Sequence, residues 1–251
     1  MVDVIHIFGL GGQSNMVGQG ILPASPPTDP LVYNFANDYT WKIAEEPVDD
    51  GTGQVDMVSY DSSPDYGPSA KFGKELKDLA VANGLTNFYI GVVPCALGAS
   101  DLDAWARDLS VATLYGSMVN RILYAQANPP PGMVGVIDGI LFYQGEADTF
   151  DEILAHSWGD RFTTLVSDMR SDLGDPILPI VFAQISNDFR KRATPYFSLV
   201  KSRQNAVSIE RVGMITTEDL SLNSDNIHLD MASQDIVGTR FANEMWSLVD
   251  W

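Results

Sequence analysis

A serine near the start of the chain stands where a catalytic nucleophile would be expected. Ser14 follows Gly11-Gly12 and an apolar run. A serine hydroxyl attacks an ester only when a neighbouring base takes its proton. A glycine-rich turn from a strand into a helix would expose the hydroxyl beside free backbone N–H groups. The G-x-S-x-G sequence of α/β-hydrolases is absent. By itself Ser14 is better explained as a helix N-cap, so the catalytic hypothesis depends on finding a base.

The candidate base is a histidine near the C-terminus. Asp225 precedes His228 by three residues. In this D-x-x-H spacing a carboxylate can hold one imidazole nitrogen while the other faces a serine. Of the other two histidines, His6 lies within a predicted strand and is expected to be a hydrogen-bonded buried residue. His156 directly precedes a predicted helix and is expected at the surface. Elimination leaves His228 as the base, although an ordinary polar loop also produces this spacing.

Apolar runs and helical patterns alternate along the chain. Short runs that are apolar on both faces are typical of parallel strands covered by helices. Five such strands are predicted, at residues 4–8, 88–93, 139–143, 177–183 and 212–216. Helical spacing predicts helices at residues 71–82, 111–127, 157–173 and 233–249, with Ser157 as the N-cap of the third. This alternation predicts a doubly wound α/β fold.

The 251 residues fit one α/β domain that spans residues 1–251. Residues 21–68, rich in Pro, Asp, Gly and Ser, are predicted to form a long irregular excursion that walls the active-site cleft. In an open α/β sheet, ligands bind beyond the carboxyl ends of the strands. Four polar segments, 11–15, 95–100, 144–146 and 225–228, follow predicted strands or precede the last helix. We expect them to meet at one edge of the sheet.

Composition narrows the range of partners. The net charge of −18 argues against nucleic acid and against anionic membrane surfaces, because both require a basic face. No apolar stretch approaches the roughly 18 residues of a membrane span, so no membrane insertion is expected. The N-terminus does not resemble a signal peptide. The sequence leaves the localisation open. The protein could act where it is made, be exported with its signal removed, or be released by phage lysis.

The single cysteine, Cys95, excludes an intramolecular disulfide and is a rival nucleophile. A small buried hydrophobic residue is the better explanation for it. No Cys/His cluster has metal-ligand spacing, so neither a metal nor an organic cofactor is expected. Trp41, Trp105 and Tyr66 are candidates for a sugar-stacking wall, although core packing is the stronger expectation for Trp105.

Three motifs occur in an order that resembles a known family. They are GQSNM at 12–16, YQGEAD at 143–148, and D-x-x-H at 225–228. Together they resemble the sialate O-acetylesterase-like branch of SGNH hydrolases, which includes the acetylxylan esterases of carbohydrate esterase family 6. Residues 96–100, followed by Trp105, are similar to the Gly-Gly-Thr-Ser…Trp segment of that branch. The resemblance runs from about residue 6 to 245 and implies a three-layer α/β/α flavodoxin-like fold.

The resemblance implies roles at the matching positions. Ser14 would be the nucleophile, and its backbone N–H would be one donor of an oxyanion hole. Gly98 would supply a second backbone N–H, although Ala96-Leu97 stand where the family pattern has a glycine. Gln144 replaces the side-chain asparagine of the wider superfamily, and its amide would be the third donor.

Two acids of the YQGEAD motif have open roles. Glu146 and Asp148 could both hydrogen-bond backbone groups and shape the cleft. Glu146 is also the alternative acid that orients His228. We favour Asp225 for that role, because three-residue spacing places it beside the imidazole.

These inferences predict a carbohydrate O-acetylesterase that hydrolyses acetyl esters on a poly- or oligosaccharide by a Ser-His-Asp mechanism. The alternatives are an esterase or lipase of the same superfamily that acts on longer acyl chains, and a carbohydrate-binding module with an inactive site. The sequence leaves open the sugar, the acyl position and the oligomeric state.

Overall fold

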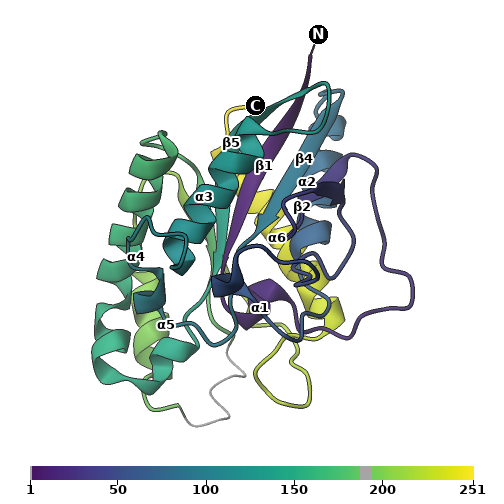
Figure 1. The fold of residues 1–251 in the computed structure, drawn as a ribbon. Coiled ribbons are helices and arrows are strands. Elements are labelled where there is room, and N and C mark those ends of the chain that lie inside the picture. The colour runs from purple at the N-terminus through teal and green to yellow at the C-terminus, as the bar shows by residue number, and fades with distance from the viewer. Residues whose placement is uncertain (1, 187–193) are drawn as a thin grey trace.

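One sheet organises the computed structural model, which describes residues 2–186 and 194–251 (Figure 1). Seven strands lie within these ranges: β1 (Asp3–Gly12), β2 (Val32–Phe35), β3 (Trp41–Ile43), β4 (Phe88–Pro94), β5 (Met133–Tyr143), β6 (Ile180–Ala183) and β7 (Val212–Ile215). Their order in space is β3-β2-β4-β1-β5-β6-β7, and only β2 and β3 pair antiparallel. Without β2 and β3, this is the 2-1-3-4-5 order of flavodoxin-like folds. The predicted α/β fold with a central parallel sheet is confirmed.

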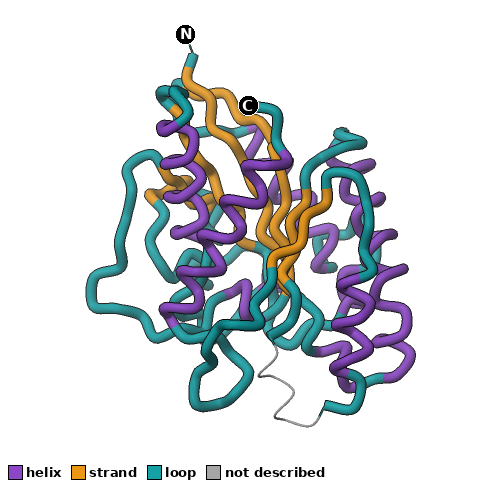
Figure 2. Tube along the Cα trace, turned by 180° about the vertical axis from the view of Figure 1, so that it is seen from behind, coloured by secondary structure: helices purple, strands orange, loops and turns teal. Residues whose placement is uncertain are grey.

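Helices cover both faces of the sheet. The described helices are α1 (Ser14–Val17), α2 (Ser69–Ala82), α3 (Leu114–Ala127), α4 (Glu152–Leu173), α5 (Phe197–Asn205) and α6 (Met231–Leu248). Short 3-10 turns are η1 (Met57–Ser59), η2 (Leu102–Trp105) and η3 (Ala147–Phe150). Buried side chains of α3, α4 and α5 belong to one hydrophobic cluster, and those of α2 and α6 to the other. Figure 2 shows the strands passing between these layers from the opposite side.

The first strand is longer than predicted. The apolar run indicated residues 4–8, but β1 continues to Gly12, which is paired in register with Tyr143 at the end of β5. The glycines concealed this extension, because glycine is depleted in strands. Gly9 and Gly11 are required by packing, since a Cβ at either position would lie within 3.0 Å of the side chain of Met118. The longer strand carries the chain directly to Ser14.

The prediction that residues 21–68 are wholly irregular is wrong. This segment contributes β2 and β3 to the edge of the sheet. The two strands have four and three residues, too few to show a periodic pattern. The segment is fixed by buried polar side chains. The carboxylate of Glu46, for example, accepts hydrogen bonds from the backbone N–H groups of Val48, Gly67 and Ala70.

Helix α4 begins five residues earlier than predicted. Its N-cap is Asp151, whose carboxylate accepts from the N–H groups of Ile153 and Leu154, and not Ser157. Ser157 lies inside the helix and donates to the carbonyl oxygen of Ile153 at 2.7 Å. His156 is therefore an exposed helical residue and does not precede the helix. Helix α5, whose apolar pattern is weak, was not predicted.

Candidate active site

The four predicted segments meet at the carboxyl edge of the sheet. Ser14 follows β1, Gly98 follows β4, and Glu146 follows β5, while His228 precedes α6. All four line a cavity of about 710 Å³. Because β4 and β5 flank β1 on opposite sides, the cavity lies at the switch point where flavodoxin-like folds bind ligands. Residues 61–63 of the long loop form a further part of its wall, as expected for that loop.

A continuous hydrogen-bonded line joins the serine, the histidine and the aspartate. The Nε2 atom of His228 lies 2.9 Å from Oγ of Ser14, and its Nδ1 atom lies 2.7 Å from Oδ2 of Asp225. The other carboxylate oxygen of Asp225 accepts from the backbone N–H groups of Ile227 and His228. These contacts fix the carboxylate and the ring relative to the same short loop. Side chains in this arrangement can act as a nucleophile, a general base and an orienting acid.

The environment keeps Asp225 ionised. Partial burial raises the pKa of its carboxyl group, but the hydrogen bonds from the backbone and ring of His228 and from the backbone of Ile227 outweigh burial. The net effect is a lowered pKa. A carboxylate that stays charged can stabilise the imidazolium formed when His228 takes a proton.

A strained glycine places Ser14 at this edge. Gly12 has φ +128°, and a Cβ there would lie 2.2 Å from the carbonyl oxygen of Tyr143. Only glycine accommodates this backbone conformation and this close approach. After Gly12 the chain leaves β1, and Ser14 begins α1 with 8% of its surface exposed.

Gly98 brings a backbone N–H close to the serine. A Cβ built on Gly98 would lie 3.9 Å from Cβ of Ser14. Its N–H donates to Oδ2 of Asp61 at 3.2 Å, so a carboxylate of the long loop occupies this donor. A substrate carbonyl that uses the Gly98 N–H must displace Asp61. Sequence reasoning missed Asp61, because no motif links the loop to the cavity.

The side-chain amide of Gln144 is engaged within the protein. Its Nε2 donates to Oδ2 of Asp148 at 2.5 Å and to the carbonyl oxygen of Ser100 at 3.2 Å, and its Oε1 accepts from Nε1 of Trp158. Gln144 is 1% exposed and is not among the residues that line the cavity. These contacts do not place its amide where the sequence analysis expected an oxyanion donor.

The neighbouring glutamine, Gln13, faces the cavity instead. Its Oε1 accepts from the N–H of Ala147 at 3.2 Å, the N–H of Gly145 at 3.5 Å and the Nε2 of Gln144 at 3.4 Å. Three donors on one oxygen fix the orientation of the amide. Within the described part of the chain its Nε2 has no hydrogen-bond acceptor, and Gln13 lines the cavity beside Ser14.

Glu146 is bonded to Asn15 and not to His228. Its Oε1 accepts from Nδ2 of Asn15 at 2.9 Å, and burial raises its pKa against this hydrogen bond. The Oδ1 of Asn15 accepts from the N–H of Leu229 at 3.0 Å, while its Nδ2 also approaches the carbonyl oxygen of Ile227 at 3.4 Å. Glu146 therefore holds Asn15, and Asn15 holds the backbone on both sides of His228.

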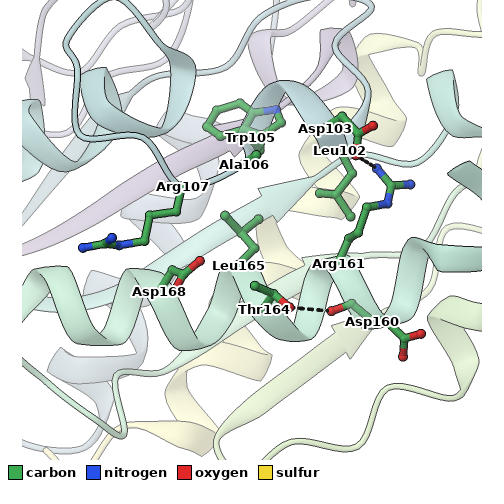
Figure 3. Close-up of a pocket in the computed structure, with 10 residues that line it drawn as sticks. All are labelled: Leu102, Asp103, Trp105, Ala106, Arg107, Asp160, Arg161, Thr164, Leu165 and Asp168. Carbon is green, nitrogen blue, oxygen red and sulfur yellow. Dashed lines mark hydrogen bonds and ion pairs between the residues drawn. The ribbon is translucent and has the colours of Figure 1, made fainter.

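Asp148 accepts a hydrogen bond from Gln144 and pairs with Arg161. Arg161 lines a second, smaller cavity of about 220 Å³ between η2 and α4 (Figure 3). Figure 3 shows Arg161 pointing toward Asp103, to which its Nη1 donates at 2.8 Å. The Nη2 of Arg161 pairs with Asp148. Burial raises the pKa of Asp148 despite its bonds to Gln144 and Arg161. The pair braces the turn that follows β5.

Several other candidates lie away from the cavity. Cys95 is buried, and burial raises the pKa of its thiol to about 12, which leaves it a poor nucleophile. Trp105 is 1% exposed within the core, and the hydroxyl of the buried Tyr66 donates to Asp235. Trp41 packs edge-on against Phe35. The proposed sugar-stacking wall of these three aromatic residues is therefore wrong.

Within residues 2–186 and 194–251, no group of three or more His, Cys, Asp or Glu side chains is arranged to hold a metal ion. No helix in this part of the chain is long and apolar enough to cross a membrane.

A flavodoxin-like sheet with Ser14 after its first strand and a D-x-x-H loop before its last helix defines an SGNH-type hydrolase fold. Residues 4–247 match the family described as "Carbohydrate esterase, sialic acid-specific acetylesterase". The chain belongs to this family and is an esterase by that membership.

Comparison with individual proteins agrees with this assignment. The chain is 31% identical over 254 residues to the probable carbohydrate esterase At4g34215 of Arabidopsis thaliana, which covers 94% of this chain and 88% of that protein. The solved structure of that Arabidopsis thaliana protein superposes with a TM-score of 0.84, at 27% identity over 99% of this chain and all of the other.

Two more distant structures share the fold alone. XAC1771, a carbohydrate acetylesterase from Xanthomonas citri, has a TM-score of 0.68 at 20% identity, covering 97% of this chain and 56% of the other. NanS has a TM-score of 0.69 at 15% identity, covering 98% of both chains.

Proposed function

We propose that this esterase removes acetyl groups from a poly- or oligosaccharide by a Ser-His-Asp mechanism. The observation that carries the proposal is the pair of hydrogen bonds that joins Ser14 Oγ to His228 and His228 to Asp225. Ser14 and His228 both line the cavity. The carbohydrate part rests on family membership and on the name of the 31% identical relative, a probable carbohydrate esterase.

In the first half-reaction, Oγ of Ser14 attacks the ester carbonyl carbon while Nε2 of His228 accepts the hydroxyl proton. The tetrahedral intermediate collapses as the C–O bond to the sugar breaks. The imidazolium gives its proton to the departing sugar oxygen, which leaves an acetyl ester on Ser14. Asp225 holds the ring and stabilises its charged form throughout.

In the second half-reaction, water replaces the sugar. His228 takes a proton from the water as its oxygen attacks the acetyl-serine carbonyl, and then returns that proton to Oγ of Ser14. Acetic acid leaves with the second proton of the water and ionises to acetate in solution, and the resting enzyme is restored. The proton balance closes on His228 and water alone, so the mechanism requires neither a metal nor an organic cofactor.

For the oxyanion we assign the backbone N–H groups of Ser14 and Gly98 and the Nε2 of Gln13. The proximity of Gly98 to Ser14 and the fixed amide of Gln13 in the cavity support this set. Preorganised donors of this kind stabilise the transition state without reorganisation. Gln144, which was expected to be the third donor, instead supports Gln13 through its contact with Oε1.

The test is acetate release by the wild-type enzyme from acetylated xylan, O-acetylated sialic acid and acetylated bacterial polysaccharides, with ethyl esters from acetate to octanoate as an acyl-chain series. We expect acetate release from at least one sugar ester and a preference for acetate in the ethyl series. A preference for octanoate without action on any sugar would indicate a lipase. Binding of a polysaccharide without hydrolysis of any ester would indicate an inactive binding module.

A further inference from the structure

Among the residues that the structure describes, one large aromatic side chain lies in the wall of the cavity, two residues beyond the YQGEAD motif. Phe150 ends η3, four residues after Glu146, and lines the cavity with 61% of its surface exposed. Exposing a large apolar side chain to water is unfavourable. Its place in the wall leaves the ring accessible to a ligand in the cavity.

The backbone that carries Phe150 is rigid. On one side, Asp148 and Thr149 are fully buried, and the Thr149 hydroxyl donates to the carbonyl oxygen of Glu146 at 2.7 Å. The carbonyl oxygen of Thr149 also accepts from the N–H of Tyr196. On the other side, Asp151 caps α4. A ring on such a base is held in place before a ligand arrives, which lowers the entropic cost of binding.

The size of the cavity indicates what packs on this ring. A volume of about 710 Å³ is far larger than an acetyl group requires, and it falls within the roughly 300–1,000 Å³ of sites for drug-sized ligands. The space beside the serine therefore accommodates the alcohol part of the ester. In a sugar ester this part is a pyranose ring with its neighbours.

The remaining wall combines polar side chains with the apolar Ala99, Ala147 and Ile227. Gln19, Asp61, Ser62, Ser63 and Asp101 contribute amide, carboxylate and hydroxyl groups to the same cavity. A long acyl chain in this space would cover those groups without hydrogen-bonding them, which is costly. A sugar has an apolar C–H face for an aromatic ring and hydroxyl groups for the polar wall, so its chemistry matches both.

We propose that Phe150 is a specificity-determining platform on which the pyranose ring of the ester's alcohol part stacks. This inference rests on the proposed function and adds the position of the sugar to it. The acetyl group then lies at Ser14, and the sugar extends along η3. The contact is equally strong in the ground state and the transition state, so it governs KM and leaves kcat nearly unchanged.

The experiment measures acetate release from acetylated xylo-oligosaccharides, from glucose pentaacetate and from ethyl acetate, whose alcohol part is too small to reach a platform. Phe150→Ala should raise KM for the sugar esters about tenfold and leave ethyl acetate hydrolysis within about twofold of wild type. Phe150→Tyr, which keeps the ring, should retain wild-type KM. The matched control is Ile153→Ala, because Ile153 is 76% exposed three residues further on and does not line the cavity. It should leave hydrolysis of both kinds of ester unchanged.

Three results for Phe150→Ala would overturn the platform. The first is an unchanged KM for both sugar esters. The second is an equal loss of activity on ethyl acetate, which would show a structural role. The third is a selective loss of activity on ethyl hexanoate, which would show an acyl-chain role. A wild-type enzyme that cleaves ethyl acetate but no sugar ester would overturn the platform and the carbohydrate assignment while leaving the serine mechanism intact. Wild-type activity retained by Ser14→Ala would instead refute the serine mechanism, whatever Phe150 does.

Discussion

The Nδ1 atom of His228 lies 2.7 Å from Oδ2 of Asp225, while the alternative acid, Glu146, is bonded to Asn15. Asp225→Asn should therefore be severely damaging. The amide keeps the shape but inverts the hydrogen bond to the ring, a change that costs about 10⁴ in kcat in a Ser-His-Asp triad. Glu146→Gln keeps an oxygen for Asn15 and should lower kcat by less than about tenfold.

Both variants are compared by kcat for acetate release at neutral pH, with circular dichroism to establish that they fold. If Glu146→Gln is the more damaging of the two, Glu146 is the acid that serves His228, and the assignment of Asp225 is wrong.

The oxyanion assignment separates the two glutamines. Gln13→Glu keeps an acceptor for the N–H groups of Gly145 and Ala147 but replaces Nε2 with a carboxylate oxygen. We expect kcat to fall by at least about 10² with little change in KM, as for the loss of one oxyanion donor. Gln144→Ala removes the hydrogen bond to Oε1 of Gln13 and leaves the indole N–H of the buried Trp158 without its acceptor. It should therefore lower the melting temperature.

Steady-state kinetics and thermal unfolding of both variants decide the matter. If Gln144→Ala is fully stable and loses more kcat than Gln13→Glu, the third oxyanion donor is Gln144 and not Gln13.

Asp61 occupies the Gly98 N–H that we propose as an oxyanion donor. Its carboxylate accepts from the N–H of Gly98, and its charge opposes an oxyanion at that position. Asp61→Ala should raise kcat/KM for ethyl acetate about fivefold, corresponding to the ~1 kcal/mol of one net hydrogen bond. Asp65→Ala removes a carboxylate of the same loop that does not line the cavity and should have no effect. A fall in kcat/KM for Asp61→Ala would show that the carboxylate assists the reaction.

A buried carboxyl outside the site makes stability depend on pH. Burial raises the pKa of Asp49 to about 7, against the hydrogen bond from Asn37 and the charge of Arg121. The folded state thus binds a proton that the unfolded state releases above its ordinary pKa of about 4. The contribution of Asp49 to stability is full below that value and is lost as pH rises through about 7.

Asp49→Asn should reduce the decline in the free energy of unfolding between pH 4 and pH 7, measured by urea denaturation. Asp50→Asn, at an exposed neighbouring position, is the control and should leave the pH profile unchanged. A wild-type slope in Asp49→Asn would show that Asp49 is charged in the folded protein across this range.

The strands that carry the site could be predicted because each is a short apolar run next to a polar motif. The glycines of β1 hid its last four residues, and β2 and β3 were missed because short edge strands have too few residues for a pattern. The end of β1 pairs with β5 and β2 pairs with β4, and these partners lie far apart in the chain and leave no local signal.

The site residues that could be predicted are likewise those whose contacts are local in the chain. The D-x-x-H spacing predicted the pairing of Asp225 with His228, because both residues lie on one loop. The roles of Gln13 and Gln144 depend on which neighbours bond their amides, and those neighbours come from other segments. Asp61 and Phe150 reach the cavity from an irregular loop and a short turn. In such segments the spacing of residues does not indicate which way a side chain points.

The central claim is that Ser14 attacks the ester. The most direct measurement is the rate of acetate release by Ser14→Ala, on the sugar ester that the wild-type enzyme cleaves best, with circular dichroism to establish the fold. Loss of the nucleophile should lower kcat by a factor on the order of 10⁴–10⁶ while the fold stays intact. A folded Ser14→Ala enzyme that keeps more than about a tenth of the wild-type rate would show that Ser14 is not the nucleophile.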